Sequence, residues 1–387
     1  MQKAPRKSKK KLLIAGLVLL AIVSGVLAIF IPWGANPQAQ PNNIPETRVS
    51  PYGEEVPDRY GIWPTEEFTA GRKPLWVRTG LLNITLGFRE FFSAGRSDSL
   101  LILHKGKLVY ERYSNGFDKE TPHYMASVTK SVVSALVGVA VGDGIIGGVE
   151  DKVIDYFPEA ETLPGWQESK RDMTIEHLLT MTSGILADAD EIWDGYFAED
   201  QEDSALYAFL IPQTYAPGEK YQYDSIAPCI LLGIIERAGG VNILAYARER
   251  LFSPLGMDSV EWETTADGLP TGGFGLDMTP RDMLRFGYLY LNYGRWEDSV
   301  SGDTQQILPA DWVAKTPPRS KAVQAYGYLF WNYRQAPFSG AYEARGAGGQ
   351  YIIIQPDRDL VIARTGSPGI KFVMKIRSLL GLSPTGN

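Results

Sequence analysis

The sequence predicts an α+β protein in which one antiparallel sheet, built from distant segments and flanked by helices, is interrupted by a helical insertion. Strand-like patterns occur in residues 99–113 and again in residues 351–365. Helical patterns dominate the stretch between them, and we place the insertion at about residues 142–295. Strands separated by a long run of helices are typical of α+β architecture. At 387 residues, the chain is long enough for a large domain of this kind.

The first part of the chain predicts a membrane anchor. Residues 1–11 form a basic tail, and residues 12–31 carry no charge. A helix of that length spans about 30 Å, the thickness of a bilayer's hydrocarbon core. We predict a transmembrane signal-anchor over residues 12–32, with the tail in the cytoplasm and the body outside, in the periplasm or at the cell surface. The alternative is a cleavable signal peptide, which would make the protein secreted.

The remaining elements follow in order. Residues 33–75, rich in proline, read as an extended linker, and a folded domain over residues 76–387 follows. Its first element is a hairpin of two strands, 99–104 and 108–113, around a glycine turn. Further helices are predicted at 127–141, 174–181, 230–238 and 280–293, then strands at 351–355 and 360–365, and a closing helix at 371–380.

Charge argues against a nucleic-acid partner. Six of the 38 basic residues lie in the tail, which leaves a formal charge of −13 on the remainder of a chain whose net charge is −7. Binding to phosphate backbones needs clustered lysine and arginine, and an acidic body lacks that cluster. We therefore expect no nucleic acid among the partners.

The most informative pair of residues is Ser127 and Lys130, at the start of the apolar helix predicted from residue 127. Residues three apart share one helix face, so the lysine nitrogen can reach the serine hydroxyl. The helix N-terminus also offers N–H groups and a positive dipole end to a developing oxyanion. Ser8 and Lys11 have the same spacing in the basic tail, so the spacing alone does not identify a nucleophile.

Two other segments suggest a catalytic role only in combination with Ser127 and Lys130. Tyr223 could relay a proton beside a serine–lysine pair, although a packing role is the simpler interpretation. The glycine-rich run at residues 346–350 could let a substrate approach a strand edge, although an ordinary turn is the simpler interpretation.

The few cysteines and histidines argue against a metal site and against a histidine-based active site. Cys229 is the only cysteine, and the three histidines are His104, His123 and His177. None is paired at the spacing of metal ligands, and we expect neither a metal nor another cofactor. The chain contains no G-x-S-x-G elbow, which disfavours a histidine-based serine hydrolase. We expect a satisfied structural role for His177 on its helix.

Taken in order, these segments resemble the serine β-lactamase-related family, which includes class C β-lactamases, DD-peptidases, esterases and 6-aminohexanoate-dimer hydrolases. Ser127-Val-Thr-Lys130 matches the S-x-x-K motif, and Tyr223-Asp224-Ser225 is a Y-x-S form of the family's Y-x-N. Gly346-Ala347-Gly348 stands where many members have K-T-G or H-T-G. Residues 174–184 also match the family's T-I-x-H-L-L-T-x-T-S-G.

The resemblance implies a DD-peptidase/β-lactamase-like fold and an acyl-enzyme formed on Ser127. Lys130 and Tyr223 would act as general base and acid, with either as the primary base. The oxyanion hole would consist of the backbone N–H groups of Ser127 and Gly349. The substrate-binding residues would be Ser225, Gly346, Ala347 and Gly348.

Departures from the family pattern indicate the type of substrate. The third motif lacks the lysine or histidine that helps hold a substrate carboxylate, and Ser225 replaces the motif's asparagine. Arg345 could supply a positive charge, but strand alternation would point it to the other face. The motif forms are most similar to the 6-aminohexanoate-dimer hydrolase and esterase branch. We therefore expect a small-molecule ester, amide or peptide substrate.

Two alternatives remain. One is a β-lactamase or DD-peptidase acting on cell-wall-type peptides. The other is a catalytically inactive, membrane-tethered binding protein of the same fold.

Overall fold

A computed structural model describes residues 97–185, 190–297, 303–316, 326–332 and 340–366. The predicted tail, anchor, linker and closing helix lie outside these residues. Within the described ranges, no single helix is both long and apolar enough to cross a membrane. One pair of helical segments, Ala227–Gly239 and Ile243–Leu255, is together long and apolar enough for a membrane span, but the pair is sharply bent, and length and composition are the only grounds for considering it.

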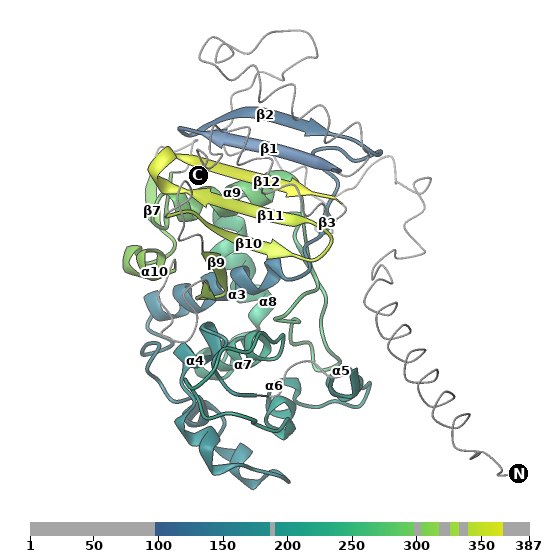
Figure 1. Cartoon of the computed structure of the whole chain (residues 1–387), viewed down its shortest axis with the longest axis vertical. Coiled ribbons are helices and arrows are strands. Elements are labelled where there is room, and N and C mark those ends of the chain that lie inside the picture. The colour runs from purple at the N-terminus through teal and green to yellow at the C-terminus, as the bar shows by residue number, and fades with distance from the viewer. Residues whose placement is uncertain (1–96, 186–189, 298–302, 317–325, 333–339, 367–387) are drawn as a thin grey trace, which may run out of the picture. The chain divides into compact units, whose positions relative to one another are not determined.

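A seven-stranded antiparallel sheet forms one layer of the fold, with the strand order β2-β1-β12-β11-β10-β9-β8 (Figure 1). Its strands are β1 (Ser99–His104), β2 (Lys107–Tyr113), β8 (Tyr326–Gly327), β9 (Phe330–Asn332), β10 (Tyr342–Gly346), β11 (Gln350–Gln355) and β12 (Leu360–Thr365). Strand β1 pairs with β12, where Leu101 lies opposite Ala363. The sheet is therefore assembled from distant segments, as the sequence predicts.

Smaller strands complete the β structure. Strands β3 (His123–Tyr124), β5 (Leu276–Met278) and β4 (Glu261–Trp262) form a three-stranded sheet in that order, and β6 (Arg295–Glu297) pairs with β7 (Thr304–Gln306). Pairing of β3 with β5 fixes the chain immediately before Ser127.

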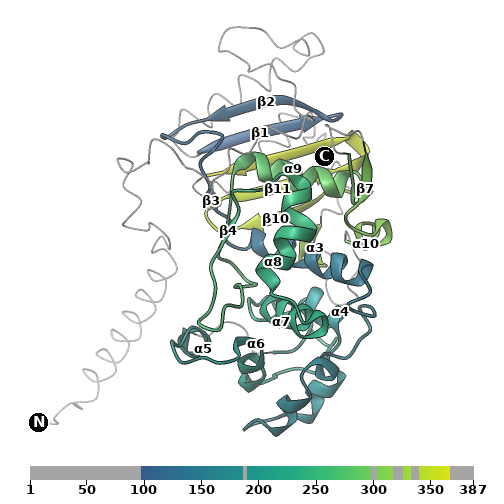
Figure 2. The same ribbon diagram turned by 180° about the vertical axis from the view of Figure 1, so that it is seen from behind.

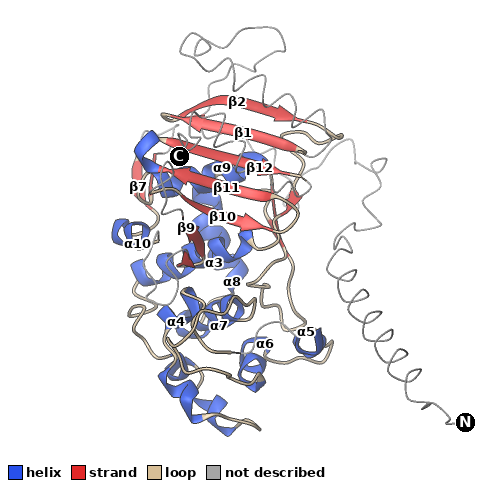
Figure 3. Ribbon diagram, in the orientation of Figure 1, coloured by secondary structure: helices blue, strands red, loops and turns tan. Residues whose placement is uncertain are grey.

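Some of the α-helices lie against the sheet, and the others extend beyond its β10 side (Figures 2 and 3). They are α3 (Val128–Gly142), α4 (Ile175–Leu179), α5 (Asp190–Tyr196), α6 (Ser204–Tyr207), α7 (Ala227–Gly239), α8 (Ile243–Ala247), α9 (Pro280–Leu291) and α10 (Ala310–Lys315). Short 3₁₀ turns and one π-helical turn, Arg248–Phe252, connect them.

Two of these helices, α3 and α9, pack on the sheet. Helix α9 approaches closely because Gly287 has no side chain: a Cβ there would clash with Val361 and Ile352. The insertion predicted at about residues 142–295 thus includes a helix that belongs with the sheet. Helix α3 is buried along almost its whole length and also packs on α7, in the helical part. It therefore connects the two parts and carries Ser127 at their junction.

Candidate active site

Ser127 lies at the start of α3, in a turn held by hydrogen bonds to main-chain carbonyl groups. Met125 N donates to Leu276 O over 2.8 Å, and Thr129 Oγ1 donates to Ala126 O over 2.7 Å. Ala126 has a φ of +46°, a conformation that non-glycine residues rarely adopt. The Ser127 hydroxyl makes no capping bond to the helix. The turn thus presents the hydroxyl beside α3 while its backbone enters the helix.

The Lys130 side chain lies directly against this serine. It is 1% exposed, and its Nζ lies 3.1 Å from Ser127 Oγ. The same nitrogen donates to Ser225 Oγ over 3.0 Å and to Gly273 O over 2.7 Å. A buried lysine nitrogen is costly unless hydrogen bonds replace its lost hydration, and these three oxygens supply them. Lys130 Nζ therefore contacts the hydroxyl groups of both Ser127 and Ser225, two site residues predicted from the sequence.

Gly273 is the contact that the sequence did not reveal. It belongs to the run Thr271-Gly-Gly-Phe-Gly275, and a Cβ on it would clash with Ser225. Adjacent Gly272 is pressed equally closely against the Pro228 backbone at the start of α7. Paired glycines with no obvious turn role were the available signal, since they often mark a close backbone approach.

Tyr223 contacts Lys130 through its ring. Lys130 Nζ lies over the face of the ring, 4.9 Å from its centroid. The ring stacks on Trp331 with centroids 5.9 Å apart and meets Tyr326 edge-on at 5.8 Å. Asp224, the next residue, accepts hydrogen bonds from the N–H groups of Ile226 and Ala227 and so begins α7. Tyr223 is thus fixed between α7 and the β8–β9 hairpin.

The third predicted segment ends β10 beside the serine turn. Gly346 passes so close to the Met125 carbonyl that a Cβ could not fit between them. Ala347 and Gly348 follow and are exposed. Gly348 and Gly349 have φ values of +80° and +92°, which suit only glycine. The segment therefore lies at the site, with Gly346 as its point of contact.

Arg345 is paired within the protein. Its Nε donates to Glu343 Oε1 over 2.5 Å, and Glu343 is fully buried. Its guanidinium also lies 5.1 Å from the Trp331 ring centroid. Arg345 is therefore neutralised by a carboxylate, beside the aromatic group that holds Tyr223.

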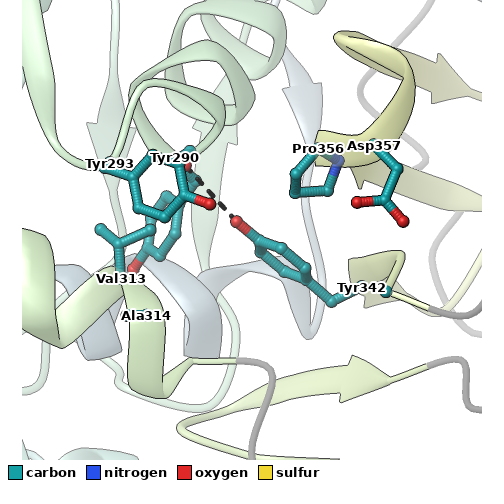
Figure 4. Close-up of a pocket in the computed structure, with 8 residues that line it drawn as sticks. Tyr290, Tyr293, Val313, Ala314, Tyr342, Pro356 and Asp357 are labelled. Carbon is teal, nitrogen blue, oxygen red and sulfur yellow. Dashed lines mark hydrogen bonds between the residues drawn. The ribbon is translucent and has the colours of Figure 1, made fainter.

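A separate hollow is lined by Tyr290, Tyr293, Val313, Ala314, Gly340, Tyr342, Pro356 and Asp357 (Figure 4). Pro356 follows the end of β11, whereas the glycine turn precedes its start. The six residues of β11 place those two ends roughly 17 Å apart. The hollow is therefore remote from Ser127 and contains none of the predicted site residues.

A serine at the start of a buried helix, in contact with a lysine one turn on and beside a sheet edge, is the arrangement of serine hydrolases that use lysine in place of histidine. Comparisons with known proteins agree with this class. A family model described as Beta-lactamase matches residues 90–366, and the chain belongs to that family. It is a serine hydrolase by family, which confirms the resemblance drawn from the motifs.

Known relatives include amide and ester hydrolases. The 6-aminohexanoate-dimer hydrolase of Paenarthrobacter ureafaciens is 23% identical over 297 residues, covering 70% of this chain and 72% of that protein. A family VIII carboxylesterase has a similar structure, with a TM-score of 0.63 at 17% identity over 78% of this chain and 97% of its own. A penicillin binding protein from Bacillus halodurans gives a TM-score of 0.61 at 17% identity, over 76% and 98% of the two chains.

Proposed function

We propose that the protein hydrolyses small ester or amide substrates through an acyl-enzyme on Ser127. The observation that carries this proposal is the 3.1 Å contact between Lys130 Nζ and Ser127 Oγ. It is within the distance required for direct proton transfer between a base and a nucleophile. The buried position of Lys130 keeps bulk water away from that contact.

The reaction proceeds in two steps. Ser127 Oγ attacks the substrate carbonyl as its proton moves to the neutral amine of Lys130, and the tetrahedral oxyanion forms. The carbonyl–leaving-group bond then breaks, and the leaving group takes a proton delivered through Tyr223. Water then attacks the acyl carbonyl and gives up a proton, the bond to Ser127 Oγ breaks, and Ser127 Oγ takes a proton as the acid product leaves. The direct contact supports Lys130 as the first acceptor. The role of Tyr223 rests on the family motif, and the centre of its ring lies at the site, 4.9 Å from Lys130 Nζ.

The oxyanion needs two N–H donors, and one is that of Ser127 at the helix start. We assign the second to Ala347, in preference to Gly349. Gly346 marks the closest approach of β10 to the serine turn, and Ala347 comes directly after it. Gly349 lies on the far side of the turn, next to Gln350 of β11. Replacing Ala347 by proline removes the N–H, and we expect kcat/KM to fall by about 10²-fold or more.

The substrate is proposed to be neutral near the scissile bond. The third motif lacks a cationic side chain, and nearby Arg345 is neutralised by Glu343. The names of the similar proteins, a 6-aminohexanoate-dimer hydrolase and a carboxylesterase, support the same class. Membrane attachment through residues 12–32 remains part of the proposal on the strength of their apolar sequence. Full-length protein should stay in the membrane pellet after a high-salt wash, and a soluble mature form would contradict the anchor.

The test of function is turnover of p-nitrophenyl acetate. We expect wild type to be active, Ser127→Ala and Lys130→Met to lose at least about 10³-fold in kcat/KM, and Tyr223→Phe to lose about 10²-fold. Ser134→Ala is the matched control, because Ser134 is a buried serine on the same helix. Equal activity of wild type and Ser127→Ala would refute the proposal, and an absence of turnover in both would favour an inactive binding protein of this fold.

A further inference from the structure

We infer that Arg364 is a positioning residue, which holds the glycine turn at residues 347–349 in its active conformation. The inference rests on the proposed function, because the turn matters only if it binds the oxyanion. Arg364 is on β12, fully buried, and its NH1 donates to Gly349 O over 2.6 Å. Its Nε donates to Ser97 Oγ over 3.1 Å. One guanidinium thus ties the turn to the chain that enters β1.

The turn is held from both faces of the sheet. Side chains alternate along a strand, so Arg364 and Ala363 point to opposite faces. Ala363 belongs to the core on the side of α3, and Arg364 therefore lies on the far face. Gly346 contacts the Met125 carbonyl at the serine turn, and Gly349 O meets Arg364. The exposed residues between these two contacts are those that face the substrate.

The turn needs a contact from outside to fix its conformation, because its own residues do not favour one backbone conformation. Three of the four residues in the run 346–349 are glycines, which have few conformational preferences. A hydrogen bond from a charged donor is shorter and stronger than one between neutral groups, and burial strengthens it further. A guanidinium also fixes its donors in a plane, which a lysine ammonium does not. Arg364 therefore selects one orientation of the Gly349 carbonyl among several that the glycines allow.

Burial also shifts the protonation equilibrium of this side chain. It lowers the pKa of Arg364 to about 10. The guanidinium is still charged at neutral pH, so its hydrogen bond to the turn is charge-assisted where the enzyme would work. No part of the reaction passes a proton through Arg364.

The test compares Arg364→Met and Arg364→Lys with Arg281→Met. Arg281 is the matched control: its guanidinium donates two hydrogen bonds to Glu111 on β2, an edge strand of the same sheet. Each variant is normalised by titrating its active sites with a fluorophosphonate and assayed with p-nitrophenyl acetate. We expect kcat/KM to fall about 10- to 100-fold in Arg364→Met, with KM changed less than about threefold. Arg281→Met should lose less than about threefold.

A boronic acid supplies a second readout, because its tetrahedral adduct with Ser127 places an oxygen in the oxyanion hole. Its Ki should rise by the same factor as kcat/KM falls in Arg364→Met, and stay near the wild-type value in Arg281→Met. Arg364→Lys keeps the buried charge and serves as the test if Arg364→Met does not fold. A fall in kcat/KM of at least about fivefold in Arg364→Lys supports the inference.

Arg364 variants with wild-type kcat/KM and Ki, or with losses no larger than the control's, would overturn the inference. Failure of the proposed function looks different. In that case wild type itself neither reacts with the fluorophosphonate at Ser127 nor hydrolyses the ester.

Discussion

Lys130 shows how a single side chain links the parts of this site. Its nitrogen contacts a residue on its own helix, one before α7 and one before β5. The S-x-x-K spacing predicts the first contact, because it depends only on helix geometry. Ser225 was predicted from the family motif, and its contact with Lys130 needed the fold. Gly273 was not predicted, because paired glycines signal a close backbone approach but do not show which side chain the carbonyl accepts from.

Ala126 leads to the first prediction at this scale. Its φ of +46° is strained for alanine by about 1 kcal/mol, and far more unfavourable for a β-branched residue. Ala126→Gly should change the free energy of unfolding by less than about 1 kcal/mol and keep activity, because relief of strain offsets the greater freedom of the unfolded chain. Ala126→Val should destabilise by more than about 1 kcal/mol and lower kcat. Urea unfolding measures the stability of each variant, and ester turnover measures its activity. Equal stability and equal kcat in the two variants would contradict the claim that the backbone at Ala126 is strained.

At the scale of elements, strong periodic patterns were predictable and irregular ones were not. The hairpin, strands β11 and β12, and helices α3, α7 and α9 lie where the sequence predicts them, within a few residues. The β8–β9 hairpin was not predicted. Its turn residues, Tyr328 and Leu329, both have positive φ, where a pattern would require Asn-Gly. Tertiary bonds hold the turn: Leu329 N donates to Leu179 O, and Ser131 Oγ donates to Leu329 O.

Strand β3 yields a prediction about pH. His123 is buried against Phe117, with ring centroids 4.4 Å apart, and burial lowers its pKa to about 4. The unfolded chain, with a histidine pKa near 6.5, binds this proton at a higher pH than the folded one does. The stability that neutral His123 contributes is therefore present above about pH 6.5 and is lost as the pH falls towards 4.

The measurement is the free energy of unfolding of wild type and His123→Phe between pH 7 and pH 4. Wild type should lose up to about 3 kcal/mol more than the variant over that range. Parallel curves for the two proteins would show that His123 does not titrate as a buried neutral group.

At the scale of the whole molecule, the order of motifs gave the family, and the fold brings those motifs together. Ser127, Tyr223 and Gly346 are far apart in the chain, and the α3 junction, the start of α7 and the end of β10 bring them to one place. The contacts of the glycine turn could not be predicted from the sequence. Its motif was recognised, but the contact made by Gly346 and the anchor provided by Arg364 depend on strand register.

The neutralised Arg345 predicts substrate preference. Without a free cation at the third motif, a substrate carboxylate gains no ion pair at the site. We expect kcat/KM for p-nitrophenyl butyrate to exceed that for nitrocefin, a carboxylate-bearing β-lactam, by at least about 100-fold. Rapid nitrocefin hydrolysis would contradict this and favour the β-lactamase alternative.

The central claim is that Ser127 is the nucleophile. The most direct measurement is mass spectrometry of the protein after reaction with a fluorophosphonate, followed by peptide mapping. We predict one adduct, located on Ser127, which is absent in Ser127→Ala and formed at least about 10³-fold more slowly in Lys130→Met. An adduct on another residue, or no adduct on protein that is folded, would contradict the account.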